Sequence, residues 1–226
     1  PFSILFRGCS FLIAYEAGVL AAFQELSPDI LKSASRIYGA SSGSIIATLG
    51  LCECDLGKGY ALPFTLYEWK LFFISVVESS PRGSFLGGKA FKTLKDVLDK
   101  ILPTNAHQLV SGKLHVIVTR VHDWRSVVVS EFASREELIQ ALLCSCFIPL
   151  WFGFLPPRYH GVRYIDGELG MWRANFVSRT TITVSPFSGE YDICPKDGPA
   201  AFFALQFSDC ILHISKRNIF RLHYVF

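Results

Sequence analysis

The sequence predicts an α/β fold in which a mostly parallel sheet is covered by helices on both faces. Short apolar or β-branched runs alternate with segments of helical spacing along the 226 residues. Half of the residues are hydrophobic and only 18% are charged, so the chain can bury a sizeable core. The length fits one domain, which we assign to residues 1–226.

Strands are predicted where apolar or β-branched residues form short runs. The first run ends in a glycine-containing loop, and the second meets Gly39. Two runs in the middle of the chain, separated by the turn 122–125, have the pattern of a hairpin. A later run reaches Asp166 and Gly167, and the last is rich in β-branched residues, as buried strands are. The predicted strands are 2–6, 37–38, 114–121, 127–132, 162–165 and 180–184.

Helices are predicted where apolar residues recur at helical spacing. The first helix ends before Pro28, and the last opens on Ser134, a typical N-cap residue that is followed by two glutamates in the first turn. Loops rich in serine, glycine or proline are expected at 79–88 and 147–157. The predicted helices are 11–26, 44–54, 61–77, 91–102 and 134–146.

Composition and charge exclude several classes of protein. The net charge is +3, from 22 basic and 19 acidic residues, so no large field points to a nucleic-acid partner. No stretch reaches the roughly 18 to 20 uninterrupted apolar residues that a transmembrane helix requires. Seven cysteines without zinc-ligand spacing indicate reduced, cytosol-facing thiols. A basic cluster is interpreted as a solvated helix face, with contact to anionic lipid as the alternative: Lys216, Arg217, Arg221 and His223.

The chain begins without an initiator methionine and without the features of a signal peptide. We therefore expect a domain cut from a longer chain, whose membrane-targeting part lies outside this sequence.

The strongest local motif is Gly-Ala-Ser-Ser-Gly at 39–43, a G-x-S-x-G pattern between a predicted strand and a predicted helix. A sharp strand-to-helix turn exposes the hydroxyl of Ser41, and the small neighbours leave room around it. The N-terminus of the following helix favours negative charge. Ser41 is therefore the predicted nucleophile, and the alternative is a purely structural glycine and serine turn.

A serine nucleophile needs a base, and the sequence favours an aspartate over a histidine. Asp166 ends a predicted strand, and active sites of open α/β sheets gather at the carboxyl ends of strands. Asp197 lies between Pro195 and Pro199 and is interpreted as a surface turn. No histidine follows a glycine-rich strand end beside an acidic partner, so all six are interpreted as structural or solvated: His107, His115, His122, His160, His213 and His223.

Several segments together carry a family resemblance. They are the loop 8–12, the motif 39–43, the block 142–149, the strand end 163–167 and the run 181–189. In this order, over nearly the whole chain, they resemble the patatin-like phospholipase family, and more narrowly its adiponutrin and adipose-triglyceride-lipase branch.

The resemblance implies a three-layer α/β/α fold and a Ser-Asp dyad without histidine. Ser41 would attack an ester carbonyl, and Asp166 would take its proton and later activate water. Backbone N–H groups of Gly8, Cys9 and Ser10 would hold the oxyanion. The implied function is a lipid acyl hydrolase or transacylase acting on long-chain esters such as triacylglycerols and phospholipids, without metal or cofactor. It would lie in the cytoplasm, peripheral on lipid droplets or membranes, with a protein co-activator as a further partner.

Three residues depart from the family pattern. Ser10 and Ile13 stand where the family has glycine, and Ser10 would cost about 1 kcal/mol if its φ is positive. Glu168 replaces a glycine after Asp166 and would raise the pKa of that aspartate if both are buried together.

The departures keep a second function open, a catalytically impaired lipid-binding or scaffold protein of the same fold. The apolar segment 142–155, which includes Trp151 and Phe152, is interpreted either as the lining of an acyl channel or as ordinary core.

Overall fold

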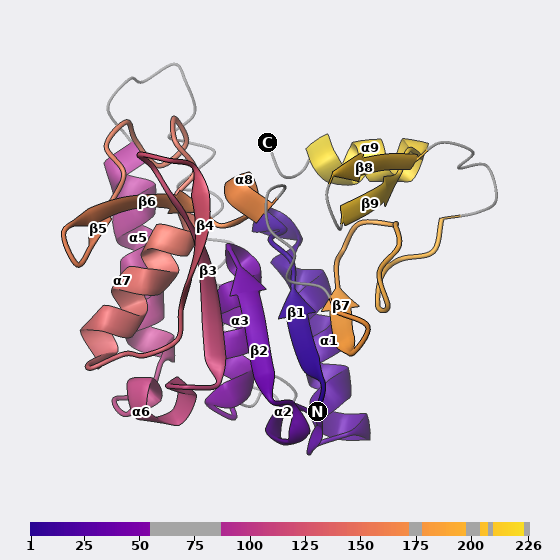
Figure 1. The fold of residues 1–226 in the computed structure, drawn as a ribbon, viewed down its shortest axis with the longest axis horizontal. Helices are drawn as coiled ribbons and strands as arrows, with labels where there is room; N and C mark the ends of the chain where they lie inside the picture. Colours follow the sequence, from indigo (N-terminus) through magenta and orange to yellow (C-terminus); the bar gives the residue numbers. More distant parts are fainter. Residues whose placement is uncertain (55–86, 172–177, 198–203, 208–209, 224–226) are drawn as a thin grey trace.

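The computed structural model describes residues 1–54, 87–171, 178–197, 204–207 and 210–223. Its main feature is a seven-stranded sheet of order β5-β6-β3-β2-β1-β7, with β4 also paired to β3 (Figure 1). The strands of this sheet are β1 (Ser3–Phe6), β2 (Arg36–Ala40), β3 (Leu114–Arg120), β4 (Arg125–Val129), β5 (Arg158–Tyr159), β6 (Val162–Asp166) and β7 (Thr181–Val184). The helices are η1 (Ser10–Leu12), α1 (Ile13–Leu26), α2 (Ile30–Ser33), α3 (Ser42–Leu51), α5 (Gly87–Ile101), α6 (Ala106–Val110), α7 (Arg135–Cys146), α8 (Glu168–Met171) and α9 (Lys216–His223).

The four neighbouring strands β3, β2, β1 and β7 run parallel, as the alternation of strands and helices predicts. Ile4, Leu5 and Phe6 of β1 are completely buried, because this strand lies between β2 and β7 with side chains covered on both faces. The α/β fold class is confirmed. The sheet as a whole is mixed, since β4, β6 and β5 add antiparallel pairs beside β3 and make the parallel part narrower than expected.

Strands β2 and β6 meet end to end along one edge of β3. Both β2 and β4 pair with Val116 and Ile117, so they occupy opposite edges of β3. Strand β6 pairs with Val118, Thr119 and Arg120 of β3, and β4 pairs with the same three residues from its own edge. Strand β6 therefore lies on the edge of β3 that β2 also occupies. Ala40 is opposite Ile117 and Asp166 is opposite Val118, the next residue. Because β2 runs parallel and β6 antiparallel to β3, their carboxyl ends face each other at this point.

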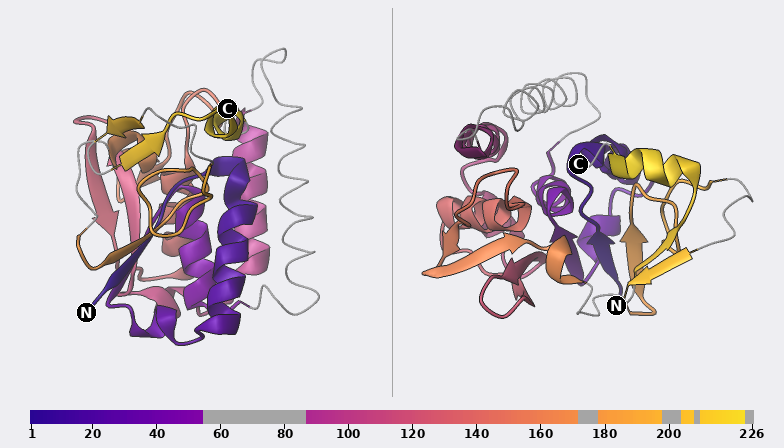
Figure 2. Two further views of the ribbon diagram at one scale, coloured as in Figure 1. Left: turned by 90° about the vertical axis from the view of Figure 1, so that its right-hand side faces the viewer. Right: turned by 90° about the horizontal axis from the view of Figure 1, so that it is seen from above.

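Helices α1, α3, α5 and α7 lie on one side of the sheet (Figure 2). Helix α3 packs directly on the sheet and is buried along almost its whole length, which agrees with its apolar sequence. On the opposite face, within the described residues, the short α8 supplies the helical cover. Its Met171 packs against Leu5, Ala40 and Ile117.

Most predicted elements are confirmed, with small shifts of their ends. The strand predicted at 37–38 extends to Ala40, and the first helix begins with the 3₁₀ turn η1. The helix predicted at 44–54 ends at Leu51. Ser134 caps α7 as expected, because its hydroxyl accepts the Glu137 N–H at 3.1 Å. The helix predicted at 61–77 and most of the loop at 79–88 lie outside the described residues.

The C-terminal part adds the hairpin β8 (Ala204–Phe207) and β9 (Cys210–His213), with α9 beside it. The interpretation of Asp197 as an exposed surface turn is wrong. Its side chain is only 3% exposed, and it pairs with Arg221 of α9 at 2.9 Å. Arg221 is correspondingly not part of a fully solvated face. The prolines and the glycine around Asp197 predict a turn, but they carry no information about a helix later in the chain that packs against it.

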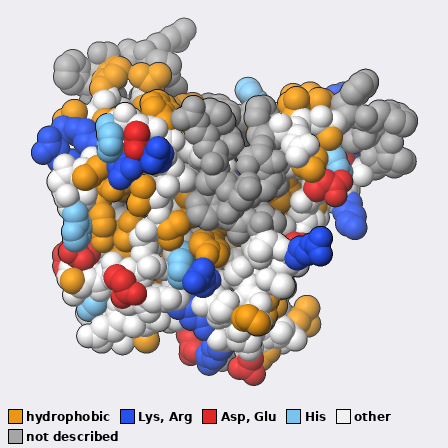
Figure 3. All heavy atoms as spheres, viewed as in Figure 1, with side chains coloured by type: hydrophobic (Ala, Val, Ile, Leu, Met, Phe, Trp, Pro, Cys, Tyr) orange, Lys and Arg blue, Asp and Glu red, His pale blue; other side chains and the backbone are white. Residues whose placement is uncertain are grey.

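Charged side chains of both signs are interspersed on the face shown in Figure 3. In the described part of the chain, no helix is both long and apolar enough to span a bilayer. Six of the seven cysteines have side chains that the structure describes, and these are free thiols: Cys9, Cys52, Cys54, Cys144, Cys146 and Cys194.

Candidate active site

Ser41 occupies a strained turn between β2 and α3. Its φ of +52° and ψ of −132° are unusual for a residue with a side chain and cost about 1 to 3 kcal/mol. The flanking glycines allow the turn to form, because a Cβ at Gly39 would collide with Ser44 and one at Gly43 would collide with the Phe6 carbonyl. This is the geometry that the G-x-S-x-G motif predicts for an activated serine.

Asp166 ends β6 and is 3% exposed. Burial raises its pKa from the ordinary 3.8 to about 7, and the charge of Glu168 acts in the same direction. Hydrogen bonds from the Ser41 hydroxyl and the Glu168 N–H lower the pKa in part. A carboxylate with a pKa near neutrality can accept a proton from serine and return it.

The meeting of β2 and β6 therefore brings the two sequence-predicted residues together. Ser41 follows the last residue of β2 and Asp166 is the last residue of β6. No histidine lines the cavity beside Ser41 in the described part of the chain. His115, His122 and His160 instead contact a backbone carbonyl, Asp123 and Glu137, respectively.

The loop after β1 lies beside Ser41, but its expected oxyanion donors are partly engaged. The Gly8 N–H donates to Glu168 Oε1 at 2.5 Å, and the Cys9 N–H donates to the Ser42 hydroxyl at 3.0 Å. Ser10 lines the cavity and has a φ of +47°, so the strain expected at this departure is present. Ile13 has a helical φ of −50°, and no glycine is needed there.

Glu168 forms an ion pair with Arg7 at 2.8 Å, besides its bond to Gly8. The Arg7 side chain is 9% exposed and that of Glu168 is 25% exposed, so the pair is largely shielded from water. The sequence singled out Glu168 but not Arg7. An arginine at the end of an apolar strand, directly before the glycine loop, is the signal that could have revealed it.

A second carboxyl group lies under the same loop. Glu16 of α1 is completely buried, and the Cys9 thiol is a hydrogen-bonding neighbour of its carboxyl group. Burial raises the pKa of Glu16 and of the neighbouring Cys9 thiol well above their ordinary values. Both pKa shifts favour the neutral forms of Glu16 and Cys9.

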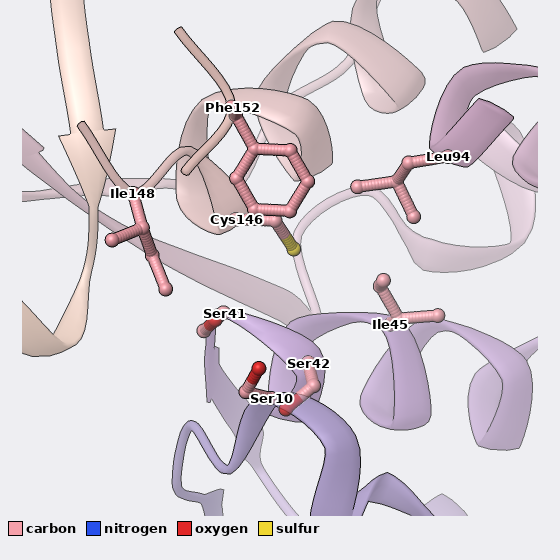
Figure 4. Close-up of a pocket in the computed structure, with 8 residues that line it drawn as sticks. All are labelled: Ser10, Ser41, Ser42, Ile45, Leu94, Cys146, Ile148 and Phe152. Atoms are coloured by element: carbon pink, nitrogen blue, oxygen red, sulfur yellow. The ribbon is translucent and has the colours of Figure 1, made fainter. Parts of the chain in front are cut away.

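A small cavity of about 30 Å³ opens at Ser41. Figure 4 shows Ser10, Ser41 and Ser42 on one side of it, with apolar side chains around the remainder. The apolar lining consists of Ile45, Leu94, Cys146, Ile148 and Phe152. This lining, apolar with a few polar groups at one end, has the chemical character that a hydrocarbon chain attached to a polar reacting group requires.

The segment 142–155 divides between the two interpretations of the sequence. Cys146, Ile148 and Phe152 line the cavity, as an acyl site requires. Leu142 and Leu143 are buried in the core. Trp151 packs against that core and does not line the cavity. Three further side chains are exposed by 71% to 87%: Leu150, Phe154 and Leu155.

Comparison with known proteins gives a consistent result. The family model for patatin-like phospholipases matches residues 4–174. Human omega-hydroxyceramide transacylase is 40% identical over 98% of this chain and 41% of its own length. Mouse 1-acylglycerol-3-phosphate O-acyltransferase Pnpla3 is 37% identical over 96% of this chain and 51% of its own length. Human patatin-like phospholipase domain-containing protein 2 is 38% identical over 97% of this chain and 42% of its own length.

Proposed function

Because this chain belongs to the patatin-like phospholipase family, we propose that Ser41 and Asp166 form the catalytic dyad of a serine lipid acyl hydrolase or transacylase. The observation that carries the proposal is the junction of β2 and β6, where a strained serine adjoins a buried aspartate with a pKa near 7. The names of the relatives support the same class of enzyme, although the chain spans only 41% to 51% of their lengths.

In the proposed reaction, Asp166 takes the proton of Ser41 as the serine oxygen attacks the ester carbonyl of a long-chain acyl lipid. The oxyanion is stabilised by N–H groups of the loop at Gly8 to Ser10, which requires Glu168 to release the Gly8 N–H or Ser42 to release the Cys9 N–H. Collapse of the tetrahedral intermediate expels the alcohol, which receives the proton from Asp166, and leaves an acyl-Ser41 enzyme. Asp166 then takes a proton from water or from a lipid hydroxyl, whose oxygen attacks the carbonyl of the acyl-Ser41 ester. Cleavage of the bond between the acyl group and Ser41 returns that proton to the serine oxygen and releases a fatty acid in hydrolysis or a new ester in transacylation.

We further propose that the protein works in the cytoplasm, at the surface of a membrane or a lipid droplet. The exposed side chains of Leu150, Phe154 and Leu155 support this, because they belong to the same loop as the cavity residues Ile148 and Phe152. Exposed apolar groups on a loop that also lines an apolar cavity offer a contact surface for lipid.

Product analysis with an acyl-labelled triacylglycerol tests this function. We expect wild-type protein to release labelled fatty acid, and to form a new labelled ester when a lipid with a free hydroxyl is supplied. Ser41→Ala should give neither product, because no acyl-enzyme forms. Equal product from wild type and Ser41→Ala would contradict the proposal.

The pH dependence of the reaction follows from the raised pKa of Asp166. The base must be ionised, so kcat/KM should rise with pH and reach half of its plateau near pH 7. An aspartate with its ordinary pKa would instead keep the enzyme fully active down to about pH 5. Rates with a soluble chromogenic ester between pH 5 and 9 distinguish the two, and a profile that is flat over this range would contradict the assignment of the base.

The second candidate function, a catalytically impaired lipid-binding or scaffold protein, is favoured by one observation. The Glu168 carboxylate already holds the Gly8 N–H that the oxyanion would need. Such a protein would keep the cavity and bind lipid while forming no product in the experiment above.

A further inference from the structure

The C-terminal end of α7 lies against the junction of β2 and β6. Ser145 is completely buried there, and its hydroxyl makes two hydrogen bonds. It accepts the N–H of Ser41 at 2.9 Å and donates to the Ile117 carbonyl of β3 at 2.7 Å. The main-chain carbonyl of Ser145 accepts the N–H of Gly167 at 3.2 Å. One residue of α7 therefore touches the nucleophile, the residue after the base and the strand β3 with which both β2 and β6 pair.

These contacts replace strand pairing at the point where β2 and β6 end. Strand β2 ends at Ala40, so the ladder to β3 does not continue to Ser41. A buried N–H without a partner destabilises the fold, and the Ser145 hydroxyl supplies the partner for the Ser41 N–H. The Ser145 hydroxyl accepts one hydrogen bond and donates another, and these two bonds together fix its orientation.

The strain at Ser41 makes this anchoring necessary. A positive φ at a serine persists only where the surrounding structure enforces it. The Ser41 carbonyl is held by the Ser44 N–H at 3.0 Å and by the Ser44 hydroxyl at 2.6 Å. The Ser41 N–H is held by Ser145. Removing the Ser145 hydroxyl would release one end of the strained peptide and let it relax.

We propose that Ser145 is a positioning residue, which holds the Ser41 backbone so that the hydroxyl stays aligned between Asp166 and the substrate carbonyl. This role rests on the proposed function of Ser41 as nucleophile. A shift of about 1 Å at a reacting group can cost about 10²-fold in rate, so Ser145→Ala should lower kcat by about that factor. KM should change little, because Ser145 does not line the cavity.

The test compares Ser145→Ala with Thr48→Ala in the same chain. Thr48 is also completely buried, and its hydroxyl donates to the Ser44 carbonyl one turn further along α3. The Thr48→Ala control therefore loses a buried hydrogen bond within α3 and leaves the contacts of Ser41 unchanged. Kinetic constants with a soluble ester, the pH profile and the melting temperature are measured for both.

We expect Ser145→Ala to lose about 10²-fold in kcat, while its kcat/KM still reaches half of its plateau near pH 7. Thr48→Ala should keep the wild-type kcat. A wild-type kcat in Ser145→Ala, or an equal loss in Thr48→Ala, overturns the positioning role. If Ser145→Ala does not fold, Ser145→Cys decides, since its thiol is a poor acceptor for the Ser41 N–H; a wild-type kcat then overturns the role. Absence of any reaction at Ser41 in wild type overturns the proposed function itself, which is a separate result.

Discussion

Replacing Asp166 by asparagine should abolish ester cleavage and, at alkaline pH, make the protein more stable. Asparagine has nearly the same shape and can still accept the Glu168 N–H, which lies 2.9 Å from Asp166 Oδ1. It cannot take a proton from Ser41, and loss of a general base typically costs about 10² to 10⁴ in rate. We therefore expect folded protein with kcat/KM at least about 10³-fold below wild type.

The gain in stability follows from the sign of the pKa shift. The pKa of Asp166 is about 7 in the folded protein and near 3.8 when unfolded, so the folded state holds its proton more tightly. Protonation of Asp166 therefore stabilises the folded state. This stabilisation is complete below about pH 4 and is lost as the pH rises toward 7. A shift of about three units corresponds to an order of 4 kcal/mol at pH 8, which Asp166→Asn should recover.

Thermal unfolding at pH 8 and pH 5 measures this effect. Asp166→Asn should melt several degrees above wild type at pH 8, and the difference should shrink at pH 5. Asp123→Asn is the matched control. Asp123 lies in an exposed turn, where hydrogen bonds from Arg120 lower its pKa to about 2. That variant should keep wild-type activity and gain no stability at pH 8, and retained esterase activity in Asp166→Asn would show that the base lies elsewhere.

The second large effect is expected at Glu168. Its carboxylate occupies the Gly8 N–H, and one oxyanion donor is worth about 10²- to 10³-fold in kcat. Glu168→Gly frees this donor, so we expect turnover to rise by at least about 10-fold. The pKa of Asp166 should fall as well, because the negative charge that raises it is removed. The cost is the loss of the ion pair between Arg7 and Glu168, which should lower the stability of the variant.

Glu168→Gln separates the charge from the occupied donor. The amide oxygen of glutamine can still accept the Gly8 N–H, so turnover at the pH plateau should stay near that of wild type. Because glutamine carries no charge, the pH at which kcat/KM reaches half of its plateau should still fall. Initial rates are measured below the melting temperature of each variant, and a turnover of Glu168→Gly no higher than that of wild type would show that the contact is not inhibitory.

The local features of this fold were predictable because each depends on a few neighbouring residues. The apolar run of β1, the G-x-S-x-G turn and the Ser134 cap of α7 are encoded within about five residues each. Ser41 and Asp166 were identified as candidates for the same reason, since each ends a recognisable strand.

Their contact was not predictable from spacing. It depends on β6 running antiparallel to β3 on the edge that β2 leaves at Ala40, which is a property of the whole sheet. The ion pair of Arg7 with Glu168 and the contacts of Ser145 likewise join residues far apart in the chain. A pattern of local residue types carries no information about such pairs.

The most direct test of the account is to locate the covalent adduct of a fluorophosphonate probe, which reacts with activated serines. Trypsin releases residues 37–58 as one peptide, which contains Ser41, Ser42 and Ser44. Fragmentation of that peptide distinguishes the three. We predict an adduct on Ser41 in wild type and none in folded Ser41→Ala. An adduct on another serine, or no adduct on folded wild-type protein, would contradict the Ser41 and Asp166 dyad.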